Sequence, residues 1–152
     1  MKKPFVSVIA LFFILFLTFN AEAWRGGMKW EGSGGWGPGA KYCAMYDVNT
    51  VATISGVVEK VERFTPEKGM GQGIHLLVKT DAETLSVHLG PKWFLEKQDI
   101  KIEAKDQVEV KGSRITFNGK PAIIAATVKK GDETLVLRDD AGIPVWAGWR
   151  KR

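Results

Sequence analysis

The sequence predicts an all-β protein built on a small closed barrel of five strands with one short helix. Three observations support this prediction. Apolar and polar residues alternate over 74–89 as in a β-hairpin. A long stretch rich in β-branched residues covers 50–64. Finally, Asn118-Gly119 separates two further strand-like runs, and this dipeptide favours a two-residue hairpin turn.

The hairpin places its apolar residues on one face. Residues 74–80 and 84–89 flank the polar turn at 81–83, and their alternating apolar residues are Ile74, Leu76, Val78, Leu85, Val87 and Leu89. Side chains of a strand alternate between its two faces, so one register turns all six toward the core. His75 and His88, the two histidines of the chain, then share the outward face as direct or diagonal neighbours.

The first strand is expected to be long and bent. Its apolar residues Ile54 and Val57 have opposite parity, and Gly56 lies between them. A glycine bulge that re-aims the strand explains this switch. The segment 65–73 contains Pro66 and three glycines, which predicts an irregular loop between the first and second strands.

The second half of the domain begins with a helix. Residues 91–98 are expected to form it, because Pro91 suits a first helical position, and its apolar side would plug an open end of the barrel. The strand over 107–117 changes parity at Gly112-Ser113, which predicts a second bulge or bend. Residues 121–128 return as the fifth strand, and 133–138 form a short sixth strand.

This order of elements is that of a five-stranded Greek-key OB-fold barrel with one short helix between strands 3 and 4. The match covers residues 50–128. The predicted organisation is a signal peptide over 1–23, a flexible linker rich in glycine and tryptophan over 24–48, and the barrel over 49–131. A short strand and a basic tail containing tryptophan follow over 132–152.

Four short runs also resemble a known family. Ile54-Ser55-Gly56-Val57-Val58 and Asp106 to Ser113 are similar to the first and fourth strands of small exported bacterial OB-fold proteins. The runs His88 to Phe94 and Leu137 to Trp146 resemble a subgroup often labelled as DNA-binding. The resemblance implies an OB barrel with a binding role. That label rests on the fold rather than on a site.

The N-terminus has the pattern of a secretory signal peptide. Lys2 and Lys3 precede an apolar run over 4–19, and Ala21-Glu22-Ala23 forms an A-x-A cleavage signal. The alternative is an uncleaved anchor, but the run is shorter than the roughly 20 residues that span a bilayer. We therefore expect cleavage after Ala23 and a periplasmic or secreted protein.

The segment 24–41 has the composition of a linker. Seven of its 18 residues are glycine, and Trp24, Trp30 and Trp36 are spaced six apart. A glycine-rich segment has little apolar surface to offset its ordering entropy. Two interpretations of the tryptophans are open: they stack on a ligand, or they lie on the protein's own barrel, which we favour. We expect the segment to be mobile and dispensable for folding.

Charge and cysteine content limit the functional classes. The formal net charge of +5 makes the protein mildly basic, but this charge does not identify a partner. Cys43 is the single cysteine, so the chain has no internal disulfide and no C-x-x-C-H haem motif. G-x-S-x-G, P-loop and H-E-x-x-H motifs are also absent from the sequence. We therefore expect a binding module without cofactor rather than an enzyme.

The candidate ligand site is the outer face of strands 2 and 3 with its flanking loops, where OB folds bind their ligands. The predicted ligand-binding residues are His75, Leu77, Lys79, Ser86, His88, Lys68, Gln72, Asn118 and Lys120, with Met70 beside them. We place no aromatic residue on this face, although binders of single-stranded nucleic acid use aromatic platforms there. An envelope protein or glycan therefore fits at least as well as nucleic acid.

Metal binding is the alternative function. The residues His75, His88, Cys43, Met45 and Met70 are ligands suited to copper or zinc. The two histidines are the residues that the pattern brings together, and a metal site needs a third ligand near them. Otherwise they are polar residues of a solvated strand face.

Overall fold

The computed structural model describes residues 34–148. The predictions for the leader, Trp24 and Trp30 lie outside these residues. Within 34–148, no helix has the length and apolar character needed to cross a bilayer.

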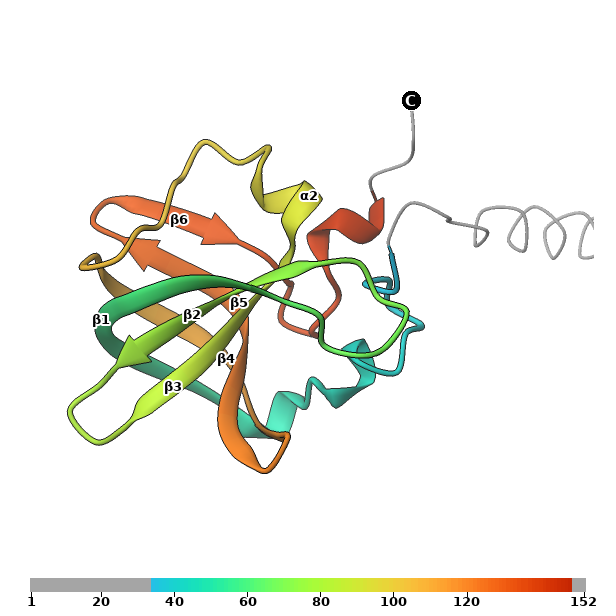
Figure 1. Cartoon of the computed structure of the whole chain (residues 1–152), viewed down its shortest axis with the longest axis horizontal. Helices are drawn as coiled ribbons and strands as arrows, with labels where there is room; N and C mark the ends of the chain where they lie inside the picture. Colours follow the sequence, from blue (N-terminus) through green and yellow to red (C-terminus); the bar gives the residue numbers. More distant parts are fainter. Residues whose placement is uncertain (1–33, 149–152) are drawn as a thin grey trace, which may run out of the picture. The chain divides into compact units, whose positions relative to one another are not determined.

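The described chain forms a closed β-barrel (Figure 1). Its strands are β1 (Val51–Phe64), β2 (Gly73–Lys79), β3 (Thr84–Pro91), β4 (Gln107–Phe117), β5 (Lys120–Lys130) and β6 (Glu133–Val136). The order is β3-β2-β1-β4-β5-β6, and a parallel pairing of β3 with β5 closes the barrel. β6 pairs with β5 and lies outside the closed set. The predicted all-β barrel and its sixth strand are therefore confirmed, and the strand order is that of the OB fold.

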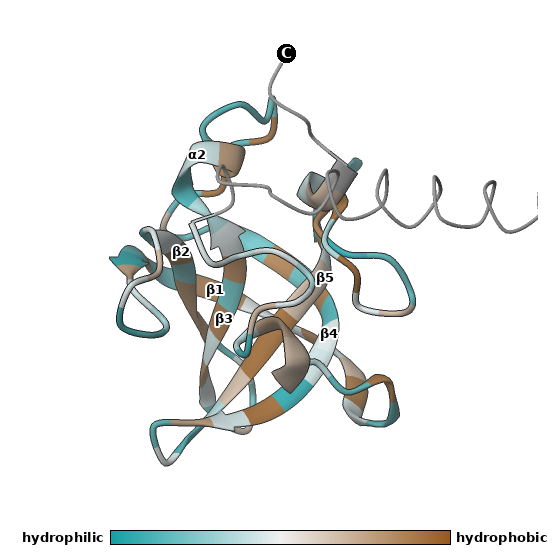
Figure 2. Ribbon diagram, turned by 90° about the vertical axis from the view of Figure 1, so that its right-hand side faces the viewer, coloured by the Kyte–Doolittle hydropathy of each residue, from teal (hydrophilic) through white to brown (hydrophobic). Residues whose placement is uncertain are grey.

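The β2–β3 hairpin has the predicted register. Leu76 pairs with Val87 and Val78 with Leu85, and all four side chains are fully buried. Hydrophobic and hydrophilic residues follow one another along the strands (Figure 2), because one face of each strand lines the barrel interior. The predicted turn is also confirmed, since Asn118 and Gly119 have φ values of 51° and 76°, as a type I′ turn requires.

The strand β1 serves both halves of the barrel. Its first half pairs with β4 and its second half with β2. The register shift lies between Val58 and Lys60, rather than at Gly56 as predicted. Gly56 has another function: a side chain there would strike the carbonyl oxygen of Lys79. The predicted irregularity of β4 is confirmed, with a register shift between Lys111 and Gly112.

The helix between β3 and β4 is shorter than predicted. The helix α2 (Lys92–Leu95) covers four residues, whereas the sequence predicts 91–98. Phe94 is buried and contacts the ring of Trp146 at a centroid distance of 5.1 Å. From Asp99 the chain runs without regular structure to β4, so α2 covers only part of this end of the barrel.

The segment before β1 is folded against the barrel. It contains the 3-10 turns η1 (Cys43–Met45) and η2 (Val48–Thr50), and Trp36 and Tyr42 have no exposed surface. The expectation of a flexible linker over 24–48 is therefore wrong from residue 34 onward. The interpretation that the tryptophans lie on the barrel is correct for Trp36. Glycine content misled the prediction, because two large aromatic side chains supply the apolar contact that offsets ordering entropy.

The C-terminal segment after β6 packs against the segment before β1. In η3 (Val145–Gly148) the indole of Trp146 is buried and donates a hydrogen bond to the carbonyl oxygen of Trp36 at 2.9 Å. Arg138, also buried, donates from Nη1 to the carbonyl oxygens of Leu89 and Ala125. Its guanidinium stacks on Trp146 at 5.0 Å. These contacts join the strands β3 and β5 to both flanking segments.

Candidate binding pocket on the outer face of β2 and β3

A cavity of about 510 Å³ lies on the outer face of β2 and β3. It is bounded by the ends of β1 and β4 and by the start of β5, and we call it the outer pocket. Its lining residues are Phe64, Thr65, His75, Leu77, Ser86, His88, Phe117, Asn118, Lys120, Pro121 and Ala122. Six of the nine predicted ligand-binding residues are in this set. The structure thus brings most of the predicted site into one hollow.

The two histidines are direct cross-strand neighbours. His75 pairs with His88 in the β2–β3 register, and their ring centroids are 6.1 Å apart. The prediction that they share the outward face of adjacent strands is therefore confirmed.

His88 is not on a solvated face, however. It is 1% exposed, because Tyr42 stacks over its ring at 5.9 Å and Phe117 approaches it edge-on at 4.9 Å. The Tyr42 hydroxyl and His88 Nδ1 share a hydrogen bond of 2.8 Å. Burial, helped by the nearby His75 and Arg138, lowers the pKa of His88 to about 3. His88 is therefore neutral at physiological pH.

His75 forms the more accessible half of the pair. Its Nδ1 shares a hydrogen bond of 2.8 Å with the Ser86 hydroxyl, and its Nε2 lies 3.6 Å from the Glu62 carboxylate. The ring stacks on Phe64 at 4.8 Å, with 17° between the planes. The imidazole is thus held flat against an aromatic neighbour by contacts at both nitrogens.

Two aromatic residues of the pocket were missed by the sequence analysis. Phe64 and Phe117 are the last residues of β1 and β4, and each contacts His88 within 5 Å between ring centroids. The expectation that no aromatic residue lies on this face is therefore wrong. Their positions next to the two flanking loops were the signal available in the sequence, since these loops border the OB ligand face.

Three predicted residues do not line the outer pocket. Lys68, Gln72 and Lys79 are exposed and absent from its lining. The loop before β2 turns toward the N-terminal segment instead, where Gly71 accepts a hydrogen bond from the indole of Trp36 at 3.0 Å. By contrast, the exposed residues Asn118 and Lys120 form a polar rim.

The proposed metal ligands are not gathered. Among residues 34–148, no group of three or more His, Cys, Asp or Glu side chains is arranged to hold a metal ion. The Cys43 thiol donates to the carbonyl oxygen of Trp36 at 3.4 Å, and burial raises its pKa. The Met70 side chain lies against Gly35. Within residues 34–148, His75 and His88 are thus not part of any such group of three.

Comparison with known protein families relates the barrel to one of them. The model of the MamS/MamX magnetosome protein family matches residues 50–135, more than half of the chain's 152 residues. The chain belongs to this family. The MamS/MamX match begins at the end of η2 and ends within β6, so it covers the barrel and its sixth strand. A comparison with curated proteins finds no match.

Proposed function

We propose that this MamS/MamX family member is a non-enzymatic binding module that holds a segment of a partner protein in the outer pocket. The observation that carries the proposal is the pocket itself. Phe64, Leu77 and Phe117 give it an apolar lining, and Ser86, Asn118 and Lys120 place polar groups around it. A largely apolar hollow with a few polar groups is the usual form of a binding site. The family name suggests that the partner is another magnetosome component.

The charge of the pocket favours a protein over nucleic acid. Lys120 is the one lysine or arginine among its lining residues. Binders of single-stranded nucleic acid combine stacking platforms with a basic groove that follows the phosphates. Here the rings of Phe64, His75 and His88 pack against one another. The pocket thus offers apolar contact with little counter-charge for phosphate.

The variant Leu77→Glu tests this proposal. A carboxylate in the apolar lining should weaken capture of the partner at least about tenfold. An apolar side chain of the partner would then bury this carboxylate, and the desolvation of the charge costs free energy. Cross-linked capture from extracts of the native host, followed by titration with the purified captured protein, measures this loss. Val136→Glu is the matched control, since Val136 is 49% exposed on β6. Equal capture by both variants would place the partner elsewhere.

Nucleic acid is the other outcome of the same experiment. A fluorescent oligothymidylate is titrated at several salt concentrations, because binding to phosphates weakens steeply with added salt. Salt-sensitive binding that Leu77→Glu abolishes and Val136→Glu preserves would assign the pocket to single strands and replace the protein partner.

We also propose that the protein acts outside the cytoplasm after losing residues 1–23. The basic residues Lys2 and Lys3, the apolar run over 4–19 and the A-x-A signal support this. The intact mass of protein isolated from the native host should correspond to a chain that starts at Trp24. A mass that includes residues 1–23 would favour a retained anchor.

A further inference from the structure

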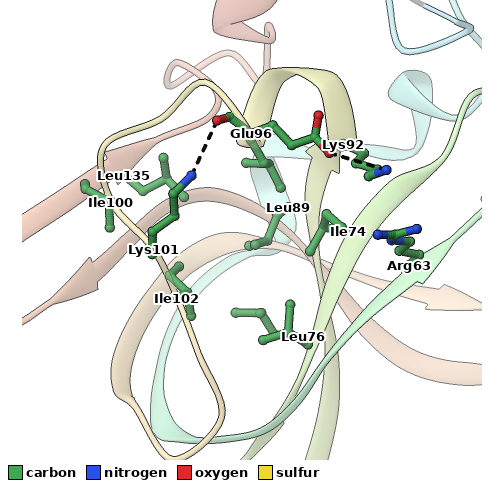
Figure 3. A pocket seen from close by; sticks show the side chains of 12 residues that line it. Arg63, Ile74, Leu76, Leu89, Lys92, Glu96, Ile100, Lys101, Ile102 and Leu135 are labelled. Atoms are coloured by element: carbon green, nitrogen blue, oxygen red, sulfur yellow. Dashed lines mark hydrogen bonds and ion pairs between the residues drawn. The ribbon is translucent and has the colours of Figure 1, made fainter.

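A second cavity, of about 240 Å³, lies at the end of the barrel below α2, and we call it the end pocket. Its floor consists of Leu76, Leu89 and Leu135, which are at most 3% exposed. The remaining apolar lining comes from Val61, Ile74, Leu95, Ile100 and Ile102. Figure 3 shows Ile74, Leu76, Leu89, Ile100, Ile102 and Leu135 converging on a common space from the strands and from the segment after α2. The end pocket is thus an apolar hollow built from several elements.

The short helix explains why this hollow exists. The sequence predicts a helix over 91–98 that plugs the barrel, but α2 ends at Leu95. Phe94 turns into the core beside Trp146 and does not line the pocket. The half-buried Ile100 and Ile102 reach over the opening from an irregular segment instead. The single turn of α2, with Ile100 and Ile102, does not fill this end of the barrel, and the end pocket remains.

The mouth of the end pocket is cationic. Arg63, Lys92 and Lys101 line it with one acid, Glu96. The Glu96 carboxylate pairs with Lys92 at 3.3 Å, whereas Lys101 Nζ donates to the neutral carbonyl oxygen of Glu96 at 3.4 Å. Within residues 34–148 neither Arg63 nor Lys101 forms an ion pair with a carboxylate. Two cations therefore remain at the mouth without a carboxylate partner.

We propose that the end pocket binds the apolar chain of a medium-length fatty carboxylate, with the carboxylate held at the mouth by Lys101. Charge complementarity selects the head group, because an acid at this mouth meets Lys101, which has no carboxylate partner within residues 34–148. The volume sets the chain length. A cavity of about 150 Å³ holds benzene, so 240 Å³ accommodates roughly eight to ten carbons.

The test compares three amphiphiles of equal chain length that differ in charge: decanoate, decanol and decylammonium. Each is titrated below its micelle concentration into the chain as isolated from its native host, with calorimetry for Kd. The methyl resonances of Ile100 and Ile102 report the location. Decanoate is expected to bind at least about tenfold more tightly than decylammonium and to shift those methyl signals. Equal affinity for the two ions, or shifts confined to Leu77 in the outer pocket, would overturn the proposal.

Two variants separate the mouth from the hollow. Lys101→Glu should weaken decanoate binding about tenfold or more, while Lys129→Glu makes the same change in net charge on β5 and should leave the affinity within about twofold. Ile102→Phe should fill the hollow and weaken binding of all three amphiphiles. If Ile102→Phe does not fold, the lysine pair still decides, and equal affinities of those two variants for decanoate would refute the assigned mouth.

Discussion

Replacing Trp36 by alanine is expected to lower the free energy of unfolding by about 3–5 kcal/mol, enough to lower Tm by more than about 10 °C. The indole has no exposed surface and contacts the rings of Tyr42, Phe64 and Trp146. It also lies over Gly73, where any side chain would strike the ring. Truncation leaves a cavity among these aromatic rings and removes the hydrogen bond to Gly71.

Thermal and urea unfolding of the purified variant measure this loss. Val48→Ala is the control, because Val48 lies in the same N-terminal segment but is 53% exposed, and it should change stability by less than about 0.5 kcal/mol. A Trp36→Ala protein as stable as Val48→Ala would mean that the segment is dispensable, as its composition first suggested. Loss of the indole should also loosen Tyr42, the cover of His88.

The parts of the fold that the sequence predicted correctly depend on local alternation. The alternation of Leu76 and Val78, with Leu85 and Val87 opposite them, is sufficient to set the hairpin register, because a slip by one residue would expose the whole apolar set. The same parity placed His75 and His88 together on the outward face. The Asn118-Gly119 turn was equally local, since its backbone requirement concerns two residues.

The parts that the sequence did not predict depend on contacts distant in the chain. Tyr42 covers His88 from 46 residues away, and Trp36 accepts its hydrogen bond from Trp146 across 110 residues. The alternation of residues along a strand gives no information about contacts between distant parts of the chain. It correctly placed His88 on the outward face, but it could not show that Tyr42 covers this face, and His88 was therefore expected to be solvated. Glycine content was misleading because the role of a glycine also depends on contacts between distant residues. Gly73 was predicted to belong to a loop, but it lies beneath the Trp36 ring, where any side chain would prevent the ring from packing on the barrel.

The buried histidine should make the protein sensitive to acid. Its pKa is 6.5 in the unfolded chain and about 3 in the folded protein, so between these values the unfolded state binds a proton that the folded state refuses. His88 therefore contributes stability that is fully present above pH 6.5 and is lost as pH falls toward 3. Between pH 7 and pH 4 this loss amounts to about 3 kcal/mol. Equilibrium unfolding in urea across this range measures it.

The variant His88→Gln isolates this effect, because glutamine keeps a polar side chain beside the Tyr42 hydroxyl but does not titrate. Its stability at pH 7 should be lower than that of the wild type, while its further loss down to pH 4 should be smaller by about 3 kcal/mol. Asp106 also makes the folded protein less stable in acid, because hydrogen bonds from the Glu103 backbone and Lys130 lower the pKa of its carboxyl group. This contribution is the same in both proteins and cancels in the comparison. His75→Gln is the matched control: it removes the smaller electrostatic effect of His75 on the pKa of His88 but leaves His88 buried beneath Tyr42, so most of the acid-dependent loss should persist. Parallel pH profiles for wild type and His88→Gln would show that His88 takes up its proton in the folded protein, which would require the Tyr42 cover to open readily.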